Sequence, residues 1–471
     1  MRWSIKIECV DGEGQFATAE VLSIERPSLE SAAELGLTLE DSKRMMALLQ
    51  ERIVEDQLRD HCRLTRICAG CARPRAIKDH RWRVIDTVFG RVRADAPRYR
   101  RCQCGYIGQP TSPVSALLPR RVLPELHHLQ LSLGAEIPYR QAAAVLRTFL
   151  PNITSFNHAT TRNRLSAVGQ AIDDELRAEI ADAKPTAAPA ETMVVGIDGC
   201  YIKGIHKARK SSIEVVLGRV ESRGRPSEVF AVVRKLDDLA KERVRSVMRR
   251  CGRGPDTEVV VLSDGEDGMR TMLGQWLDPT VKHRLDWWHL YGRLEKMRLG
   301  LIYLPIISDA DWRQRFRTAS RAIDHIRWTL WNGCECVYAT DCAITELRLE
   351  LGEHALAAFA VGRDISRIDD MNKLLDEFRK YLYGNATSLL NYNHAHTDGE
   401  RVSTAHVEST VNQLVNWRMC KKQQMRWSPT GAQNLLHVRT AILNRRLDRY
   451  TGLAALVPVV ANDDKPMPRA A

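Results

Sequence analysis

The strongest constraint on the fold of this 471-residue chain is a change of pattern near Met193. From there on, short apolar segments rich in β-branched residues alternate with segments of helical periodicity. The expected strands cover residues 194–198, 212–220, 228–233, 258–264 and 281–286. The expected helices cover residues 238–250 and 268–277. Three strands in succession followed by helix, strand, helix and strand predict an α/β core built on a mixed sheet.

Two of these expected strands end in a carboxylate. Asp198 ends the first, and Asp264 ends the fourth. If the two strands are neighbours, both side chains emerge at the same edge of the sheet, where they repel each other unless a cation lies between them. Hard oxygen ligands favour Mg²⁺ or Mn²⁺. With a third carboxylate, the pattern predicts a site for two metal ions that act on a phosphodiester.

Glu408 is the candidate for the third carboxylate. It lies in residues 406–416, whose apolar positions recur at helical spacing. Asn412 follows one turn later on the same face, where it could contact DNA or steady the site. Glu400 is the main rival for this role, but it lies in an expected loop. Glu266 and Asp267 are close enough to Asp264 to replace it as the second ligand.

Residues 290–400 have few strand signals and apolar residues at helical spacing, which predict an α-helical insertion. Three of its tryptophans could stack on bases, although their helical spacing favours a place in the core: Trp312, Trp328 and Trp331. Three of its cysteines are interpreted as free thiols because no fourth metal ligand accompanies them: Cys334, Cys336 and Cys342.

Four cysteines nearer the N-terminus form two close pairs on either side of an expected β-hairpin at residues 83–95. They are Cys68, Cys71, Cys102 and Cys104. Two thiolate pairs at the ends of a hairpin are typical of a zinc ribbon, in which the metal supplies folding energy that a small module lacks. Because the second pair is tighter than usual, Cys62, His61 or His80 could replace one of its ligands.

The remaining N-terminal sequence predicts two further regions. Residues 1–60 contain short strands followed by a helix at 38–59, for which packing or self-association is the default role. Residues 120–183 contain helices at 138–146 and 155–168, which suit either a helix-turn-helix or an ordinary helical hairpin. In the first case the DNA-contacting residues are Arg162, Asn163 and Arg164. Residues 184–190 are expected to form a linker.

Positive charge is concentrated in two segments of the chain, whose overall net charge is +12. Residues 62–105 hold twelve Lys or Arg and three Asp, and residues 416–449 hold eight Lys or Arg and one Asp. Such concentration indicates contact with a nucleic-acid backbone, although a solvated basic surface or an RNA-binding one would have the same composition. Cations interleaved with tryptophans directly after Glu408 suit an element that grips a DNA strand: Arg418, Lys421, Lys422, Arg426 and Trp427.

Taken together, four motifs resemble bacterial insertion-sequence DDE transposases, most closely the Kra-type elements related to Mutator-type transposases. They are Gly196-Ile-Asp198-Gly199, Leu262-Ser-Asp264-Gly265, Asp286-Trp-Trp-His289 and the segment around Glu408. The resemblance covers roughly residues 190–450. It implies a ribonuclease-H-like core at residues 191–289 and 401–450, interrupted by the helical insertion.

The resemblance also implies roles for individual residues. Asp198, Asp264 and Glu408 would be catalytic and hold two Mg²⁺ or Mn²⁺ ions, while Asp286 and His289 would organise the site or contact a DNA flap. The expected activity is cleavage of double-stranded DNA at element ends and strand transfer into target DNA, by a homo-oligomer. The alternatives are a structure-selective nuclease on the same fold and a non-catalytic DNA-binding protein derived from a transposase.

The expected environment is the bacterial cytoplasm, in contact with nucleoid DNA and without a membrane partner. No apolar run reaches the roughly 18 residues needed to cross a bilayer, and the first residues lack the apolar stretch of a secretory signal. In a reducing compartment, twelve cysteines indicate thiols and metal ligands instead of a disulfide framework. The zinc-ribbon module is expected at residues 61–110 and a flexible tail at 455–471.

Overall fold

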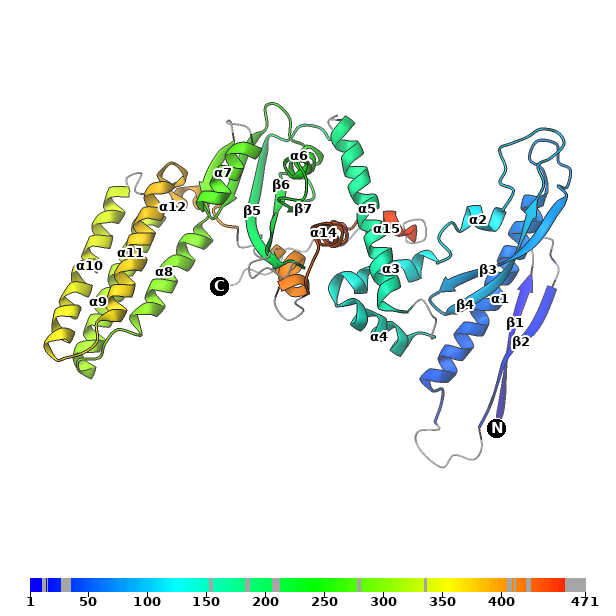
Figure 1. Cartoon of the computed structure of the whole chain (residues 1–471), viewed down its shortest axis with the longest axis horizontal. Helices are drawn as coiled ribbons and strands as arrows, with labels where there is room; N and C mark the ends of the chain where they lie inside the picture. The colour runs from blue at the N-terminus through cyan, green and yellow to red at the C-terminus, as the bar shows by residue number, and fades with distance from the viewer. Residues whose placement is uncertain are drawn as a thin grey trace. The chain divides into compact units, whose positions relative to one another are not determined.

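A computed structural model describes most of the chain (Figure 1). The described residues are 1–10, 14, 16–26, 35–151, 156–182, 187–205, 212–277, 281–333, 337–404, 409–410, 412–420 and 425–453. The chain divides into two compact units. One comprises Met1–Ala171 with Ala441–Ala471, and the other comprises Ile172–Thr440.

The first unit begins with an antiparallel pair of strands, β1 (Arg2–Val10) and β2 (Phe16–Glu25). Helix α1 (Leu39–Arg66) follows. Thr38 caps it through a reciprocal pair of hydrogen bonds with Asp41, which satisfies two otherwise unpaired backbone N–H groups. The predicted helix is therefore present and continues to Arg66, beyond its expected end.

The predicted hairpin is also confirmed. It consists of β3 (Ile77–Thr87) and β4 (Gly90–Tyr99), which pair antiparallel across a tight turn. Helix α1 packs on β4, and the two bury a shared apolar core. Its main members are Val54, Leu58, Cys62, Ile85, Val92 and Ala94.

Helices complete the first unit. They are α2 (Pro113–Leu117), α3 (Pro124–Glu136), α4 (Tyr139–Phe149), the first part of α5 (His158–Asp182), and α15 (Leu447–Thr451). The two helices expected within residues 120–183 correspond to α4 and α5, and α5 extends well past its expected end. Helix α15 packs against α3, where His128 Nδ1 lies 3.0 Å from Asp448 Oδ1.

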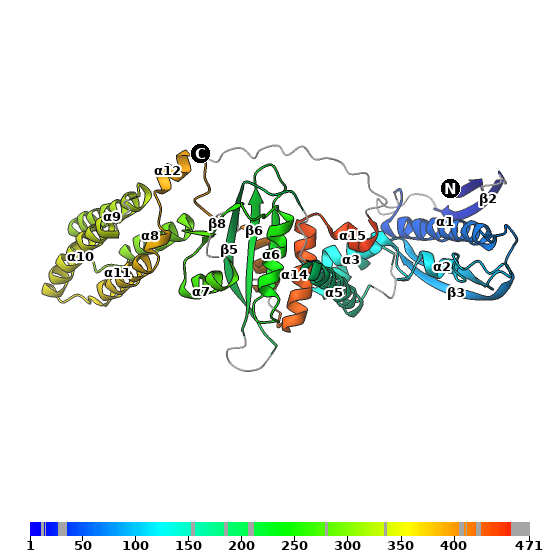
Figure 2. The same cartoon turned by 90° about the horizontal axis from the view of Figure 1, so that it is seen from above.

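The second unit contains a five-stranded mixed sheet (Figure 2). Its strands are β5 (Thr192–Lys203), β6 (Ser212–Ser222), β7 (Glu228–Val233), β8 (Glu258–Ser263) and β9 (Lys282–Leu285), in the spatial order β7-β6-β5-β8-β9. Strands β5, β6 and β7 form an antiparallel meander, whereas β8 runs parallel to β5, and β9 runs parallel to β8. All five predicted strands are present, and the mixed-sheet α/β prediction is confirmed.

Helices α6 (Ala240–Arg250) and α7 (Asp267–Trp276) cover one face of this sheet. Alternate residues of β5 and β8, such as Val195, Ile197 and Val261, pack against them in one apolar core. Because side chains alternate along a strand, Asp198 belongs to the opposite face. That face meets the segment Asn412–Cys420, which packs against β5.

The predicted helical insertion follows the sheet in the same unit. Its helices are α8 (Trp287–Leu301), α9 (Asp309–Trp331), α10 (Val337–Ala360), α11 (Ser366–Gly384), the 3₁₀ turn η2 (Ala386–Ser388) and α12 (Tyr392–Thr397). They share an apolar core of their own, to which Leu294, Ile323, Leu347 and Leu375 contribute. None of the helices in the described parts of the chain has the length and apolarity needed to span a membrane.

The C-terminal helices differ from expectation in two ways. Residues Asn412–Cys420 form a π-helix, η3, where an α-helix was expected. The expected single basic helix is two helices, α14 (Pro429–Leu443) and α15. The break coincides with Arg445, whose φ of 54° lies in the left-handed region that an α-helix cannot include. The expected tail at 455–471 lies outside the described residues.

Candidate metal centres and nucleic-acid surfaces

Three aspartates share one register across the parallel part of the sheet. On β5 and β8 the last paired residues are Gly196 and Leu262, and Asp198 and Asp264 each lie two residues further on. On β8 and β9 the last pair is Ser263 with Leu285, so Asp264 and Asp286 each follow by one residue. The predicted convergence of Asp198 and Asp264 at one sheet edge therefore fits the strand pairing, and Asp286 joins them.

The electrostatics of Asp198 reflect this crowding. Burial raises the pKa of its carboxyl group above the usual range. The backbone N–H of Gly199, 2.7 Å from Oδ1, and the nearby His289 act in the opposite direction, while the negative charges of Asp264 and Asp286 raise this pKa further. A half-buried carboxyl group beside two others is a place where a bound cation would relieve repulsion.

Hydrogen bonds hold both the side chain and the backbone carbonyl of Asp264. Its Oδ1 accepts a hydrogen bond from the N–H of Glu266 at 3.1 Å, and its carbonyl oxygen accepts one from the hydroxyl of Tyr381 on α11. The next residue, Gly265, has a φ of 68°, and a Cβ there would collide with Leu285 Cδ1. Glycine is therefore required after Asp264, both for its conformation and for its lack of a side chain.

Asp286 has a structural role that the sequence pattern did not reveal. Its side chain is fully buried and caps α8 by accepting a hydrogen bond from the N–H of Trp288 at 2.9 Å. It also accepts hydrogen bonds from the N–H of Thr404, at 2.9 Å, and from the Thr404 hydroxyl. Its Oδ2 lies 3.6 Å from His289 Nε2, one turn along α8. Asp286 thus ties the start of α8, His289 and the segment around Thr404 together.

The third predicted ligand, Glu408, lies outside the described residues. The described residues nearest to it in sequence are Thr404, which binds Asp286, and Ser409. Glu400, the rival of Glu408, is engaged in an ion pair with Arg284. Glu266 and Asp267 were alternatives to Asp264 instead, and Glu266 Oε1 lies 3.7 Å from Arg293. The side chain of Asp267 is 86% exposed, and its Oδ1 lies 2.8 Å from the guanidinium of Arg270, one turn along α7.

Several residues around the aspartates were missed from the sequence because their contacts join segments that are distant in sequence. Tyr381 is one, and the Arg293 guanidinium stacks over its ring at 4.0 Å. His283 on β9 is another, since its two ring nitrogens lie 2.8 Å from Ser263 Oγ and 2.7 Å from Ser388 Oγ. No local motif marks these residues, because their partners are set by the packing of the helical insertion on the sheet edge.

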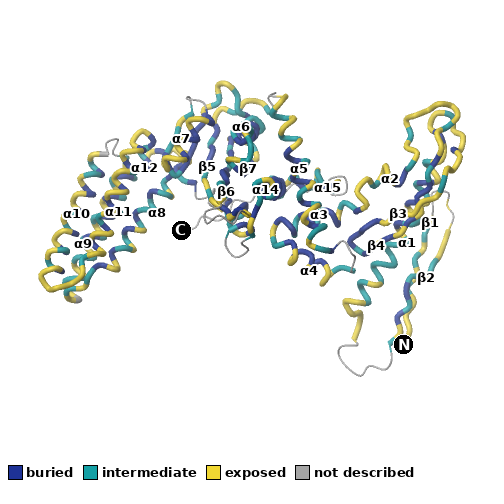
Figure 3. The backbone as a smooth tube through the Cα atoms, viewed as in Figure 1, coloured by how far each residue is buried: buried dark blue, intermediate teal, exposed yellow. Residues whose placement is uncertain are grey.

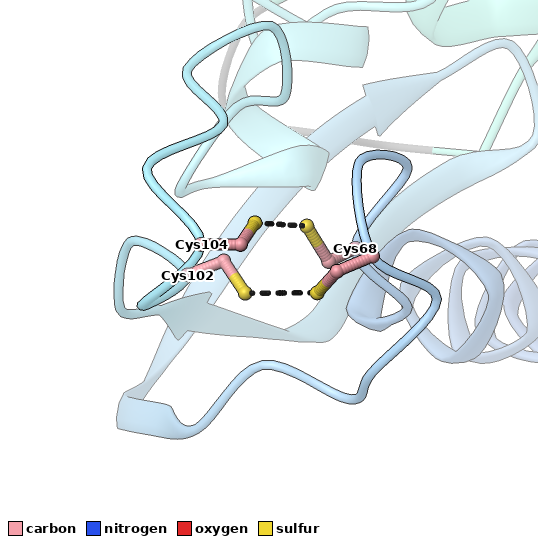
Figure 4. A group of neighbouring side chains, drawn as sticks. Cys68, Cys102 and Cys104 are labelled. Atoms are coloured by element: carbon pink, nitrogen blue, oxygen red, sulfur yellow. Dashed lines mark hydrogen bonds between the residues drawn. The ribbon is translucent and has the colours of Figure 1, made fainter.

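The four predicted cysteine ligands come together in the first unit. Cys68 and Cys71 lie on the loop after α1, and Cys102 and Cys104 lie on the loop after β4. The sulfurs of Cys68 and Cys104 are 3.6 Å apart, those of Cys71 and Cys102 are 3.4 Å apart, and all four lie within 4.8 Å of one another. Figure 4 shows the labelled side chains of Cys68, Cys102 and Cys104 directed toward one another from these two loops.

This geometry fits a structural metal such as zinc. In a tetrahedral site with Zn–S bonds of about 2.3 Å, neighbouring sulfurs are roughly 3.8 Å apart. Hydrogen bonds from the backbone N–H groups of Gly70 and Cys71 and from the neighbouring thiols lower the pKa of the Cys68 thiol to about 6, which favours the thiolate form that binds metals. The same thiol contacts raise the pKa of Cys104. The loops are joined by Gln109, which accepts a hydrogen bond from the N–H of Ala69 and donates one to the carbonyl of Ile67.

Two of the three alternative ligands have other surroundings. Cys62 is buried in the core between α1 and β4, where burial raises the pKa of its thiol to about 11. His80 Nδ1 lies 2.9 Å from Asp95 Oδ2 across the hairpin. Neither they nor His61 belong to the four-cysteine cluster, among the described residues, that could hold a metal ion.

The three residues predicted to contact DNA from α5 differ in exposure. Arg162 and Asn163 are exposed, whereas Arg164 turns inward, where it donates hydrogen bonds to Gln130 and Asp86. Beside them is a cleft of about 370 Å³ whose polar lining contains two arginines. Its lining includes Arg120, His127, Thr160, Asn163 and Arg164.

Only some residues of the basic segment after Glu408 lie at the protein surface. Arg418 and Trp427 are buried, and the Arg418 guanidinium lies 5.2 Å from the centre of the Trp427 ring. We therefore leave these two residues out of the DNA-contacting surface, although the sequence pattern placed them in it. Arg426 is exposed, while Lys421 and Lys422 lie outside the described residues.

Asn412, predicted to act beside Glu408, is the first residue of the π-helix. Its side-chain oxygen accepts a hydrogen bond from Asn416 Nδ2 at 2.8 Å. This contact spans one turn of η3, so the Asn412 amide also supports the helix itself.

An aromatic groove of about 230 Å³ lies next to Asp286, because the first residue of α8, Trp287, lines it. The remaining lining residues are Tyr291, Arg327, Trp328 and Trp331. Trp331 packs edge-on against Trp287 with ring centres 4.8 Å apart, whereas Trp328 is 55% exposed. Trp312, on the same helix as Trp328, stacks on Phe316. The expected core role thus fits Trp331, and Trp328 presents its ring to solvent.

No family model matches this chain, and no curated protein matches it in sequence. The chemistry of the two sites therefore has to be inferred from their own geometry.

Proposed function

We propose that this chain is a DDE transposase, which cleaves DNA at the ends of a mobile element and joins the freed 3′-hydroxyls to target DNA. The observation that carries the proposal is the shared register of Asp198, which lies within β5, and Asp264, which directly follows β8. Each is two residues beyond the last pair of the β5–β8 ladder. The strand order β7-β6-β5-β8-β9, with an antiparallel meander followed by two parallel strands, is that expected of a ribonuclease-H-like core.

In this proposal Asp198 and Asp264 hold divalent metal ions, and Glu408 completes the site. Bound there, Mg²⁺ or Mn²⁺ would activate the attacking oxygen and stabilise the leaving oxygen of an in-line displacement at phosphorus. Asp286 positions this edge by fixing the start of α8 and the segment at Thr404, four residues before Glu408. His289 and Tyr381 support the site by their contacts with Asp286 and with the carbonyl of Asp264.

The DNA would be held by surfaces of both units. The basic hairpin region, with the cysteine cluster binding zinc, and the exposed Arg162 and Asn163 suit the backbone of double-stranded DNA. The exposed ring of Trp328, in the groove beside Asp286, suits an unpaired base near the reacting strand.

The decisive experiment is incubation of the full chain with Mg²⁺ and the DNA that flanks its own gene, followed by sequencing of the cleaved and joined ends. Cleavage at two defined ends with joining to new DNA supports the transposase. Cleavage at branched or nicked structures without joining favours a structure-selective nuclease on the same fold. Binding without cleavage favours a DNA-binding protein derived from a transposase.

A further inference from the structure

Helix α10 carries two distinct apolar faces. One packs against α9 and α11 and includes the buried residues Ala343, Ile344, Leu347, Leu351 and Ala358. The other face is exposed along its whole length. It consists of Tyr338, Cys342, Thr345, Leu349, Gly352, Leu356 and Phe359.

The spacing of this exposed face is regular. Successive members are separated alternately by four and three residues, which is the seam of a left-handed coiled coil. The large apolar members are well exposed: Leu349 is 66% exposed, Leu356 74% and Phe359 72%. A second helix with the same spacing would cover a seam of this kind.

The seam is also open to a partner. It borders a groove of about 530 Å³ lined by Leu349, Gly352, Leu356 and Phe359, with Arg348 and Glu353 at its borders. A Cβ placed on Gly352 would meet nothing within 4 Å, so a partner side chain has room there. Within its unit, α10 lies at the outer edge of the helical insertion, and much of its outer surface is exposed (Figures 1 and 3).

We propose that α10 pairs with α10 of a second copy of this chain as a parallel two-stranded coiled coil. The charges beside the seam support this occupant and this direction. Arg348 and Glu353 occupy the two flanking positions that face each other between the chains of a parallel pair, so two Arg–Glu contacts form by symmetry. Antiparallel pairing would instead place Glu346 and Glu353 of the two copies on the same side, where they repel each other.

The remaining flanking charges are accommodated within each copy. Asp341, which would approach Glu346 of the second copy, is already paired with Arg379. Arg348 also forms an ion pair with Asp376 at the protein surface, where a further carboxylate can share the guanidinium. A parallel pair therefore has two Arg348–Glu353 contacts between opposite charges and two Asp341–Glu346 contacts between like charges, and Arg379 offsets the Asp341 charge within each copy. The pairing does not depend on the catalytic chemistry proposed above.

Cys342 provides a direct readout of this arrangement. In a parallel, in-register pair each seam residue faces its own copy, so the two Cys342 thiols approach within the range that a disulfide can bridge. Diamide can take up the two protons and two electrons released when these thiols join. In an antiparallel pair Cys342 lies opposite the other end of the seam, and the same disulfide cannot form.

The test uses the full chain in sedimentation equilibrium. Wild type is expected to dimerise, and Leu349→Glu or Leu356→Glu should weaken the dimer at least 100-fold, whereas Leu299→Glu, at a 60% exposed leucine of α8, should not. Glu353→Arg should also weaken it, because two arginines then face each other. Unchanged circular dichroism identifies variants that remain folded.

Diamide treatment followed by peptide mass spectrometry should yield a Cys342–Cys342 disulfide in wild type and none in Cys342→Ser. A monomeric wild type would overturn the proposal, including the case in which another part of the same chain covers the seam. So would a dimer that tolerates both glutamate substitutions. A dimer without the Cys342 disulfide would overturn the parallel arrangement.

Discussion

Asp198 and Asp264 lie level with each other on neighbouring parallel strands, each two residues beyond the last pair of the β5–β8 ladder. Strand β5 continues to Lys203, but its parallel pairing with β8 ends before Asp198, so this register brings the two acidic residues together where the parallel ladder ends. The raised pKa of Asp198, caused first by burial and in part by Asp264, is consistent with that proximity.

The first prediction concerns the acidic residues. Asp198→Asn, Asp264→Asn and Glu408→Gln should each reduce Mg²⁺-dependent strand cleavage by at least about 1000-fold, because each removes a charged metal ligand. DNA binding, measured by fluorescence anisotropy, should stay within a few-fold of wild type. Asp267→Asn is the matched control, since Asp267 is highly exposed and close to Asp264 in sequence. Full cleavage by all three variants would contradict the metal-site assignment.

The second prediction concerns the cysteine cluster. Cys68→Ser combined with Cys71→Ser should abolish stoichiometric zinc, measured by mass spectrometry of metals, and weaken binding to element ends. The physical reason is that a structural zinc contributes on the order of 10 kcal/mol to the folding of a small module. Cys342→Ser, a change at an exposed thiol outside the cluster, should keep the metal. Equal zinc content in the double variant and this control would refute the prediction.

The third prediction concerns the anchor at Asp286. Thr404→Val removes the hydroxyl hydrogen bond to a buried carboxylate and should lower the free energy of unfolding by about 1.5–3 kcal/mol. Chemical denaturation provides the measurement. Thr397→Val also removes a threonine hydroxyl, but at an exposed position on α12, and should cost much less. Similar losses for the two variants would argue against a special role for Thr404.

The fourth prediction concerns pH. Burial, together with the charges of Arg120, Arg164 and His128, lowers the pKa of His127 to about 4. The unfolded chain, with a pKa near 6.5, therefore binds more protons than the folded chain between these two values. Stability should fall as the pH drops from about 6.5 to 4 and then level off, with a contribution of up to about 3 kcal/mol from this residue.

The measurement compares wild type with His127→Gln by urea denaturation across that pH range. The variant should lose less stability on acidification than wild type. Parallel curves would mean that His127 is protonated equally in the folded and unfolded states.

The fifth prediction concerns the aromatic groove. Trp328→Ala should weaken binding of single-stranded DNA about tenfold, because base stacking on an exposed tryptophan contributes roughly 1–3 kcal/mol. Trp3→Ala, at an exposed tryptophan of β1, should have little effect. Equal affinities for both variants and wild type would exclude the groove as a base-binding site.

Local pattern was sufficient to predict most elements of this protein. The five strands of the sheet and the hairpin between the cysteine pairs follow from alternation and β-branched runs, which depend only on neighbouring residues. The cysteine cluster was also predictable, because a hairpin brings its two ends together whatever the rest of the chain does. Element ends were less accurate, as the extensions of α1 and α5 illustrate.

What only the tertiary structure decided is which side chains face which environment. The sequence motif at Asp286 could be recognised from the sequence alone. The full burial of the Asp286 side chain and its hydrogen bonds to Thr404, however, depend on a segment 118 residues away. Arg418 and Trp427 had the composition of a DNA-contacting surface, but the π-helix and the end of β5 turn both inward. The seam on α10 shows the same division: its spacing is present in the sequence, and only the packing of the opposite face against α9 and α11 left it uncovered. Periodicity is encoded locally, whereas burial and charge pairing result from contacts between segments that the sequence does not place side by side.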